Sequence, residues 1–219
     1  MTRWLILCVP VLVCCRQPVF RSRWTQRRAP ESYVARFETT RGNFDIQVQR
    51  KWSPAAADRM YQLLRHHYLD KALFYRVVPG FVAQFGGADT VANQAWQKHV
   101  VADEPVRKGN TRGTLSFARS GKDSRSNDLY INLADNQRLD TLAYSGVQGF
   151  PAFGWVTSGM PVVDSLYGGY SERTLEQLDM MYRDRRQFIR MFPRLDQIRK
   201  AYILRRRDRN DPGKPVAAH

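Results

Sequence analysis

The chain has 219 residues, 43% of them hydrophobic and 25% charged, a balance typical of a folded globular protein and unlike that of a disordered one. Its net charge of +15 belongs to the two ends: residues 1–30 hold six arginines and no acidic residue, residues 173–219 hold 13 basic and six acidic residues, and only +2 remains between them. The nearly neutral centre argues against a specific nucleic-acid partner, and cysteines confined to the first 15 residues exclude a downstream disulfide, thiolate metal site or thiol nucleophile.

The first 15 residues are typical of an export signal. Arg3 precedes a short apolar run over residues 4–15, whereas a membrane-spanning helix would need about 20 such residues. The stretch "LVCC" resembles a bacterial lipoprotein processing box, so Cys15 is a candidate for lipidation; cleavage with release and an uncleaved anchor are the alternatives. We expect residues 16–31 to be a basic, poorly packed linker that associates with an anionic membrane, and the protein to be exported to the periplasm or cell envelope.

The central region begins with a β-hairpin and a helix. In "YVARFETTRGNFDIQV" (33–48), two alternating runs flank a turn. Ser53 is then a suitable N-cap, and Pro54 occupies the first helical position, where a missing N–H costs nothing. His66 and His67 are adjacent and so point to different sides of this helix, which favours one surface and one packed histidine over a metal site.

Short strands and turns dominate the rest of the centre. The predicted strands cover residues 72–78, 81–86, 112–120, 128–134 and 152–159, and residues 160–167 could begin a second helix. Many short strands with two helices indicate an antiparallel barrel, closed or nearly closed and capped by helices. Residues 173–207 carry apolar residues at helical spacing, and Pro193 divides them into two predicted helices packed on the barrel. Residues 208–219 form a tail.

Four segments resemble one known family in the same order along the chain. They are "FYRVVPGFVAQFGG" (74–87), "RGTLSFARSG" (112–121), "LYINLADNQRLD" (129–140) and "FGWVTSGMPVVDSL" (153–166). Over residues 33–172 the chain thus resembles a cyclophilin-type peptidyl-prolyl cis-trans isomerase of the bacterial exported type. The resemblance implies a mainly β fold, with an eight-stranded antiparallel barrel over residues 32–172 capped by two helices. "FPRLDQIRKA" (192–201) is similar to a C-terminal helix of some bacterial members.

The resemblance also implies an activity and a site. Arg76 would donate a hydrogen bond to the prolyl nitrogen of a twisted X–Pro bond, and Gln84 would hold the guanidinium or bind the substrate backbone. Proline-containing polypeptides are the implied substrates, and no cofactor or metal is needed. The implied substrate-binding residues are Phe81, Val82, Tyr130 and Leu139 around the proline ring, Ala118 and Arg119 along the peptide, and Asp128 beside them.

Several positions depart from the family pattern. Tyr75 stands where a histidine is usual, and Tyr130 replaces a phenylalanine. Arg138 occupies the position of a tryptophan that favours cyclosporin, so we expect weak cyclosporin binding. Tyr144 or Phe150 takes the place of the usual pocket histidine.

Asp128 is the departure with the largest consequence, because glutamine is common at this position. A carboxylate there could pair with Arg76, either orienting the guanidinium or competing with substrate for it. An internal ion pair of Arg76 with Asp128 or Glu38 is also the structural alternative to a catalytic role. A chain silenced in this way would be a weak or inactive chaperone or scaffold at the cell envelope, the alternative to an isomerase that assists the folding of exported proteins.

Overall fold

The hairpin predicted at the start of the domain is formed by β1 (Ser32–Thr39) and β2 (Gly42–Gln49) in the computed structural model, which describes residues 19–87 and 90–207. Gly42 has a φ of +126°, a backbone conformation that side-chain-bearing residues rarely adopt, and it directly follows the turn. The inward-facing rings of Phe37 and Phe44 stack across the hairpin with centroids 4.9 Å apart. Register is therefore fixed both by the turn and by the core.

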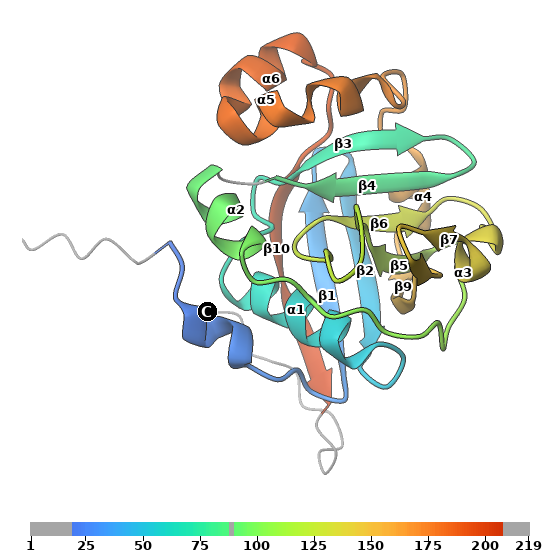
Figure 1. Cartoon of the computed structure of the whole chain (residues 1–219). Helices are drawn as coiled ribbons and strands as arrows, with labels where there is room; N and C mark the ends of the chain where they lie inside the picture. Colours follow the sequence, from blue (N-terminus) through green and yellow to red (C-terminus); the bar gives the residue numbers. More distant parts are fainter. Residues whose placement is uncertain (1–18, 88–89, 208–219) are drawn as a thin grey trace, which may run out of the picture.

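Eight antiparallel strands make one curled sheet (Figure 1). Its order is β10-β1-β2-β9-β5-β6-β4-β3, where the further strands are β3 (Leu73–Val78), β4 (Val82–Gly86), β5 (Thr114–Phe117), β6 (Leu129–Asn132), β9 (Ala152–Ser158) and β10 (Ile198–Arg207). The two edge strands meet near one end, where Leu73 bridges to Gln197 and the N–H of Lys71 donates to the carbonyl of Ile198 over 2.8 Å. The predicted mainly β, eight-stranded architecture is confirmed.

Two helices occupy the positions predicted for caps, and further short elements accompany them. The predicted pair is α1 (Pro54–Arg65), which packs against β9 and β10, and α4 (Met160–Asp164), which packs against β2. The sequence reasoning did not anticipate α2 (Thr90–Gln97), α3 (Arg138–Thr141) or the small hairpin of β7 (Ala143–Tyr144) and β8 (Val147–Gln148). The interior of the curled sheet is filled mostly by aromatic and branched side chains from the strands and by the apolar face of α1.

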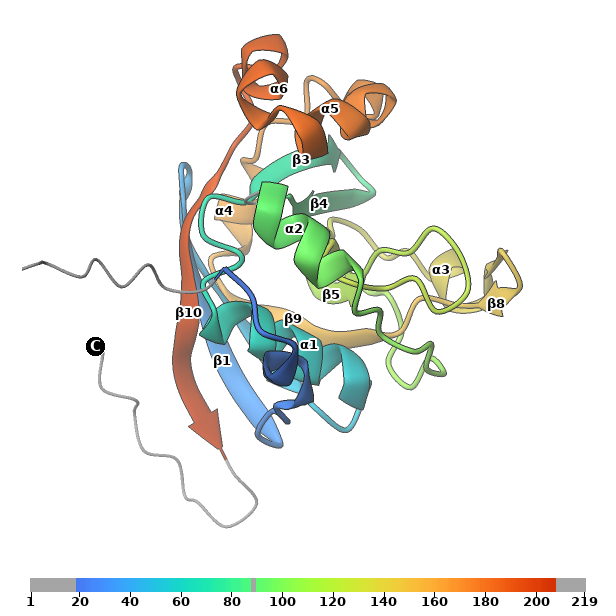
Figure 2. The same ribbon diagram turned by 60° about the vertical axis from the view of Figure 1, so that its left-hand side comes forward.

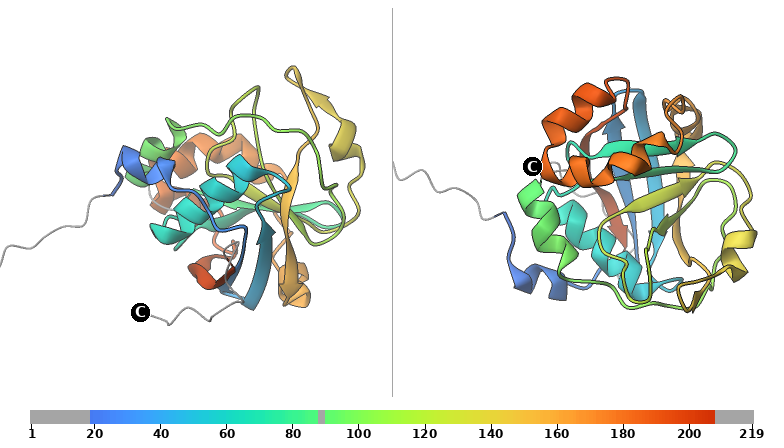
Figure 3. Two further views of the ribbon diagram at one scale, coloured as in Figure 1. Left: turned by 90° about the horizontal axis from the view of Figure 1, so that it is seen from below. Right: turned by 45° about the horizontal axis from the view of Figure 1, so that its top comes forward.

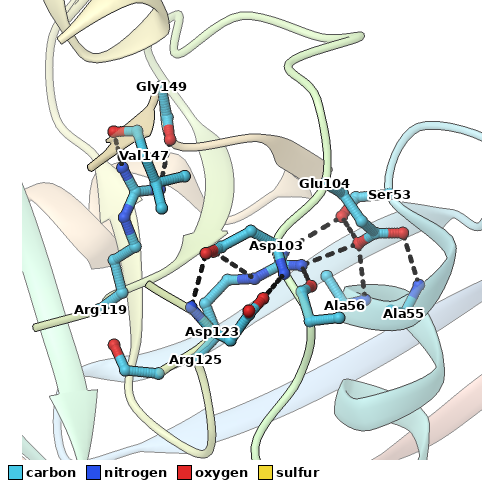
Figure 4. Close-up of polar contacts among 12 residues, drawn as sticks. Ser53, Ala55, Ala56, Asp103, Glu104, Arg119, Asp123, Arg125, Val147 and Gly149 are labelled. Atoms are coloured by element: carbon cyan, nitrogen blue, oxygen red, sulfur yellow. Dashed lines mark hydrogen bonds and ion pairs between the residues drawn. The ribbon is translucent and has the colours of Figure 1, made fainter. Parts of the chain in front are cut away.

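The start of α1 is held by a carboxylate rather than by the predicted serine cap (Figure 4). Glu104 accepts hydrogen bonds from the N–H groups of Ala55 and Ala56, at 2.9 and 3.3 Å, and from the hydroxyl of Ser53. The same carboxylate pairs with Arg125, whose side chain is 1% exposed. A negative charge at a helix N-terminus satisfies free N–H groups and interacts favourably with the helix dipole, which a serine hydroxyl does less strongly.

The segment before β1 is packed, so its prediction as a poorly packed linker is wrong for the part that the structure describes. It contains the short 3-10 helix η1 (Ser22–Gln26). Trp24 stacks on His66, the residue that directly follows α1, with ring centroids 3.8 Å apart, and Phe20 lies edge-on to Trp96 of α2 at 5.0 Å. Two aromatic residues among the arginines thus bind this segment to the helices. Figure 2 shows its backbone beside α1. His67 is exposed and lies 3.2 Å from Asp70.

The C-terminal region is half helical, and its second half belongs to the sheet. Helices η2 (Arg173–Gln177), α5 (Leu178–Arg183) and α6 (Arg185–Met191) are followed by β10, which pairs with β1 along the edge seen in Figure 2. The predicted helix over 192–201 is therefore wrong, and so are the boundaries that ended the barrel at residue 172 and assigned 173–207 to a helical extension. Ile198 and Ala201 imitate helical spacing because a β-bulge leaves Arg199 without a partner in the register, so both side chains reach the core.

Three predicted features lie outside the described residues: the export signal over 1–15, the candidate lipidation site Cys15 and the tail over 208–219. Within residues 19–87 and 90–207, no helix has both the length and the apolar character required to span a bilayer.

Candidate active site

Arg76 and Gln84 face each other on the neighbouring strands β3 and β4. Nη1 of Arg76 donates to Oε1 of Gln84 over 3.2 Å, and Nε2 of Gln84 donates to the hydroxyl of Tyr75 over 2.6 Å. The two bonds fix both ends of the amide. Gln84 thus contacts the guanidinium directly, and its roles in holding Arg76 or binding the substrate backbone stay predictions.

A β-bulge in β3 explains how the consecutive residues Tyr75 and Arg76 both reach Gln84. Between the pairs Leu73–Gly86 and Arg76–Gln84, β3 carries one more residue than β4. Side chains normally alternate between the two faces of a strand, and a bulge breaks this alternation. Tyr75 and Arg76 can therefore both contact Gln84, and a charged residue inside an apolar run lies at the edge of a groove instead of in the core.

Tyr75 is the buried acceptor that holds the Gln84 amide. Its side chain is 1% exposed, and burial together with the nearby carboxylate of Asp128 raises the pKa of Tyr75 well above its usual range. The phenol therefore stays neutral and accepts the hydrogen bond of Gln84 at all ordinary pH values. The change from the usual histidine gives this position a group that does not titrate near neutrality.

The residues predicted to surround a proline ring form one apolar cluster beside Arg76. Its buried members are Val82, Tyr130 and Leu139, with Phe81, Ala118 and Phe150 packed against them. A groove of about 790 Å³ opens between this cluster and residues 171–176. Two guanidinium groups lie near the Phe81 ring, with the Cζ of Arg76 at 5.4 Å and the Cζ of Arg138 at 4.8 Å from its centroid.

The extra hydroxyl of Tyr130 does not make the pocket polar, because it donates to Oδ1 of Asn110 over 2.9 Å and is buried. Phe150 lies edge-on to Tyr130 at 6.4 Å, whereas Tyr144 is 45% exposed. Phe150, rather than Tyr144, therefore completes the pocket where the usual histidine is missing.

The side chain of Arg119 packs against Phe150 of the apolar cluster. Its guanidinium lies 4.1 Å from the centroid of Phe150 and donates to the carbonyls of Val147, over 2.9 Å, and Gly149 (Figure 4). It thereby holds the β7–β8 hairpin and the pocket ring in place. Pairing of the Arg119 backbone with a peptide stays a prediction.

Comparison with known proteins agrees with this geometry. The family model described as cyclophilin type peptidyl-prolyl cis-trans isomerase matches residues 34–182. The chain belongs to this family. A peptidyl-prolyl cis-trans isomerase of Acinetobacter baylyi is 31% identical over 135 residues, covering 61% of this chain and 71% of the relative, and isomerase B of Escherichia coli is 32% identical over 139 residues, covering 60% and 82%.

Solved structures support the fold alone. A crystal structure of a cyclophilin type peptidyl-prolyl cis-trans isomerase of Cryptosporidium parvum has a TM-score of 0.58 and 16% identity, covering 78% of this chain and 97% of that chain. The protein is thus a cyclophilin-type isomerase, and its eight-stranded sheet is the fold of its family.

In this cyclophilin Asp128 does not pair with Arg76, which corrects one prediction. Its Oδ2 accepts a hydrogen bond from the hydroxyl of Tyr182 in α5 over 3.1 Å, and Glu38 accepts one from Tyr202 over 3.0 Å. Neither of the carboxylates proposed as an internal partner for Arg76 therefore silences it. Burial raises the pKa of Asp128 from 3.8 to about 6, so this carboxyl is partly protonated just below neutrality.

We expect Asp128→Asn to flatten the pH dependence of stability. Between about pH 4 and 6 the folded protein holds a proton on Asp128 that the unfolded chain has released, so stability falls as pH rises through this window. At pH 8 the cost is on the order of 3 kcal/mol. Urea unfolding at pH 4 and pH 8 should show the variant gaining about 2–3 kcal/mol on the wild type at the higher pH; parallel pH profiles would contradict the raised pKa.

The sequence reasoning missed the carboxylate that does contact Arg76. Oε1 of Glu172 accepts a hydrogen bond from Nη2 of Arg76 over 2.5 Å, although 96 residues separate the two. The side chain of Arg76 is 19% exposed and that of Glu172 is 60% exposed. No local sequence signal could have paired them, because Glu172 belongs to a segment that was expected only to end the barrel.

Proposed function

We propose that this isomerase uses Arg76 to stabilise the twisted X–Pro amide and that it assists the folding of exported proteins. The observation that carries the first part is the position of Arg76, held by Gln84 at the mouth of an apolar pocket. The proline ring would lie on Phe81, Val82 and Leu139, which places the amide beside the guanidinium.

The chemistry follows from the electronic structure of the amide. In the planar forms the prolyl nitrogen shares its lone pair with the carbonyl, and rotation faces a barrier of about 20 kcal/mol. Twisting localises the lone pair on nitrogen, where it can accept a hydrogen bond. A donor at that point binds the twisted state more strongly than either planar state, which is the condition for catalysis. Arginine suits this role because it donates without losing its proton.

Exchange NMR on a short Ala-Pro peptide tests this function directly. A further crystal structure of the Cryptosporidium parvum isomerase was determined in the presence of the dipeptide Ala-Pro, which makes this sequence a reasonable first probe. We expect wild-type protein at catalytic concentration to accelerate cis-trans exchange, and the added peptide to shift resonances of Phe81 and Leu139. Absence of acceleration by folded protein would leave only a binding role.

The cellular part of the proposal rests on the N-terminal sequence. Arg3 and the apolar run over 4–15 favour export, and Cys15 favours a lipid anchor at the periplasmic face of a membrane. Slow X–Pro steps limit the folding of many proteins for tens to hundreds of seconds, so an isomerase in that compartment has clients available. Mass spectrometry of the mature N-terminus after expression in a bacterial host should find a diacylglyceryl group on Cys15; an intact Met1 would refute processing.

A further inference from the structure

The helical segment, residues 165–197, connects α4 to β10 in the chain and packs over β3 (Figure 3, right). It is attached by a second apolar cluster, in which Leu73 and Tyr75 of β3 pack against Met181 of α5 and Phe188 of α6. The family model ends at residue 182, so the segment extends beyond the matched region. Its first part, residues 171–176, forms one side of the catalytic groove.

The backbone around Glu172 is held in place on both sides. Ser171 has a φ of +50°, an unfavourable conformation for a residue with a side chain, and its N–H donates to the carbonyl of Gly168 over 3.0 Å. Nη2 of Arg173 donates to the carbonyl of Gly169 over 2.9 Å. On the other side Thr174 is fully buried, and its hydroxyl donates to the carbonyl of Tyr75. The carboxylate of Glu172 is thus presented from a rigid turn that is itself bonded to β3.

The contact leaves Arg76 able to act on a substrate. A guanidinium has five N–H donors. Gln84 accepts one hydrogen from Nη1 and Glu172 accepts one from Nη2, which leaves a second hydrogen on each of these atoms. Nε of Arg76 is buried and makes no hydrogen bond within the described residues. The two acceptors therefore fix the plane of the guanidinium at both ends without using up its donors.

We propose that Glu172 is a positioning residue for the isomerase reaction, which holds Arg76 in the orientation that the twisted amide requires. The proposal rests on the proposed function of Arg76. A carboxylate that merely blocked the site would have to occupy all the donors that reach the groove, yet Glu172 accepts one hydrogen of Nη2 and Gln84 one of Nη1, so each of these atoms keeps a second hydrogen. Loss of Glu172 should therefore loosen the guanidinium and slow the reaction rather than release it.

Kinetics of three variants test the proposal. We expect Glu172→Gln to lower kcat by about three- to tenfold with KM changed less than about twofold, since orientation matters in the twisted state more than in binding. Glu172→Asp, which keeps the charge on a shorter chain, should fall between wild type and Glu172→Gln. Asp179→Asn removes one carboxylate from an 89% exposed position in the same helical segment and should leave both constants unchanged.

A double variant separates positioning from a general effect on the fold. In the Arg76→Ala background, Glu172→Gln should cause no further loss, because its effect acts through Arg76. An equal or faster rate for Glu172→Gln alone would overturn the proposal, the faster rate identifying Glu172 as an inhibitory contact. If Arg76→Ala itself keeps wild-type activity, the proposed function of Arg76 has failed instead, so the two failures are distinguishable.

Discussion

Arg76→Ala should lower kcat/KM for an Ala-Pro peptide by about 100-fold, the usual effect of removing one donor to a transition state. The substitution removes the donor that we propose for the prolyl nitrogen but leaves the apolar pocket, so peptide binding should change much less than turnover. Exchange NMR at several peptide concentrations gives both quantities. The Gln84 amide remains bonded to Tyr75 in this variant and should keep its position. The loss of activity therefore reports the contribution of the guanidinium itself.

Two further variants establish what property of Arg76 matters. Arg76→Lys keeps the charge but loses the planar fork that Gln84 and Glu172 hold, and we expect it to recover only part of the lost rate. Arg190→Ala removes an exposed charge from α6 and should match the wild type. A folded Arg76→Ala protein with a loss of less than about threefold would show that the donor lies elsewhere in the groove.

The site was predictable from sequence where its members lie in short, ordered segments. Phe81, Val82, Tyr130 and Leu139 are far apart in the chain, yet each belongs to a segment with its own recognisable pattern, and the structure brings them into one cluster. Arg76 and Gln84 were placed together by the family resemblance of one segment, residues 74–87, that contains both. The pattern that identifies each of these residues lies within one short segment, and the fold then brings the segments together.

The rest depended on contacts that local patterns do not encode. The bulge at Arg199 gave β10 the spacing of a helix, since two core positions lie three residues apart in both cases. Glu172 meets Arg76 across 96 residues. The departure at Asp128 was also assigned the wrong partner, because its carboxylate accepts a hydrogen bond from Tyr182 of the helical segment and does not pair with Arg76.

Arg125 is the clearest case of a residue without any sequence signal and with a large expected effect. Its guanidinium is 1% exposed and pairs with Glu104 at 3.1 Å and with Asp103 at 3.8 Å, while also donating to the carbonyl of Ala102 (Figure 4). It lies in the loop between β5 and β6 that also carries Arg119. The ion pair of Arg125 with Glu104 therefore joins the loop that carries Arg119 to the start of α1.

We expect Arg125→Met to lower the free energy of unfolding by about 3 kcal/mol, because it leaves two largely buried carboxylates without their cation. The side chains of Asp103 and Glu104 are 15% and 16% exposed, so water can relieve only part of this penalty. Urea unfolding at pH 7 measures the loss. Arg183→Met is the matched control: its pair with Asp179 is 4.0 Å long and more than 80% exposed on both sides, so stability should not change measurably. Equal losses of stability in the two variants would mean that burial does not determine how much these ion pairs stabilise the fold. A loss confined to Arg125→Met, together with slower isomerisation by the protein that remains folded, would show that this buried pair also keeps the loop that carries Arg119 in place.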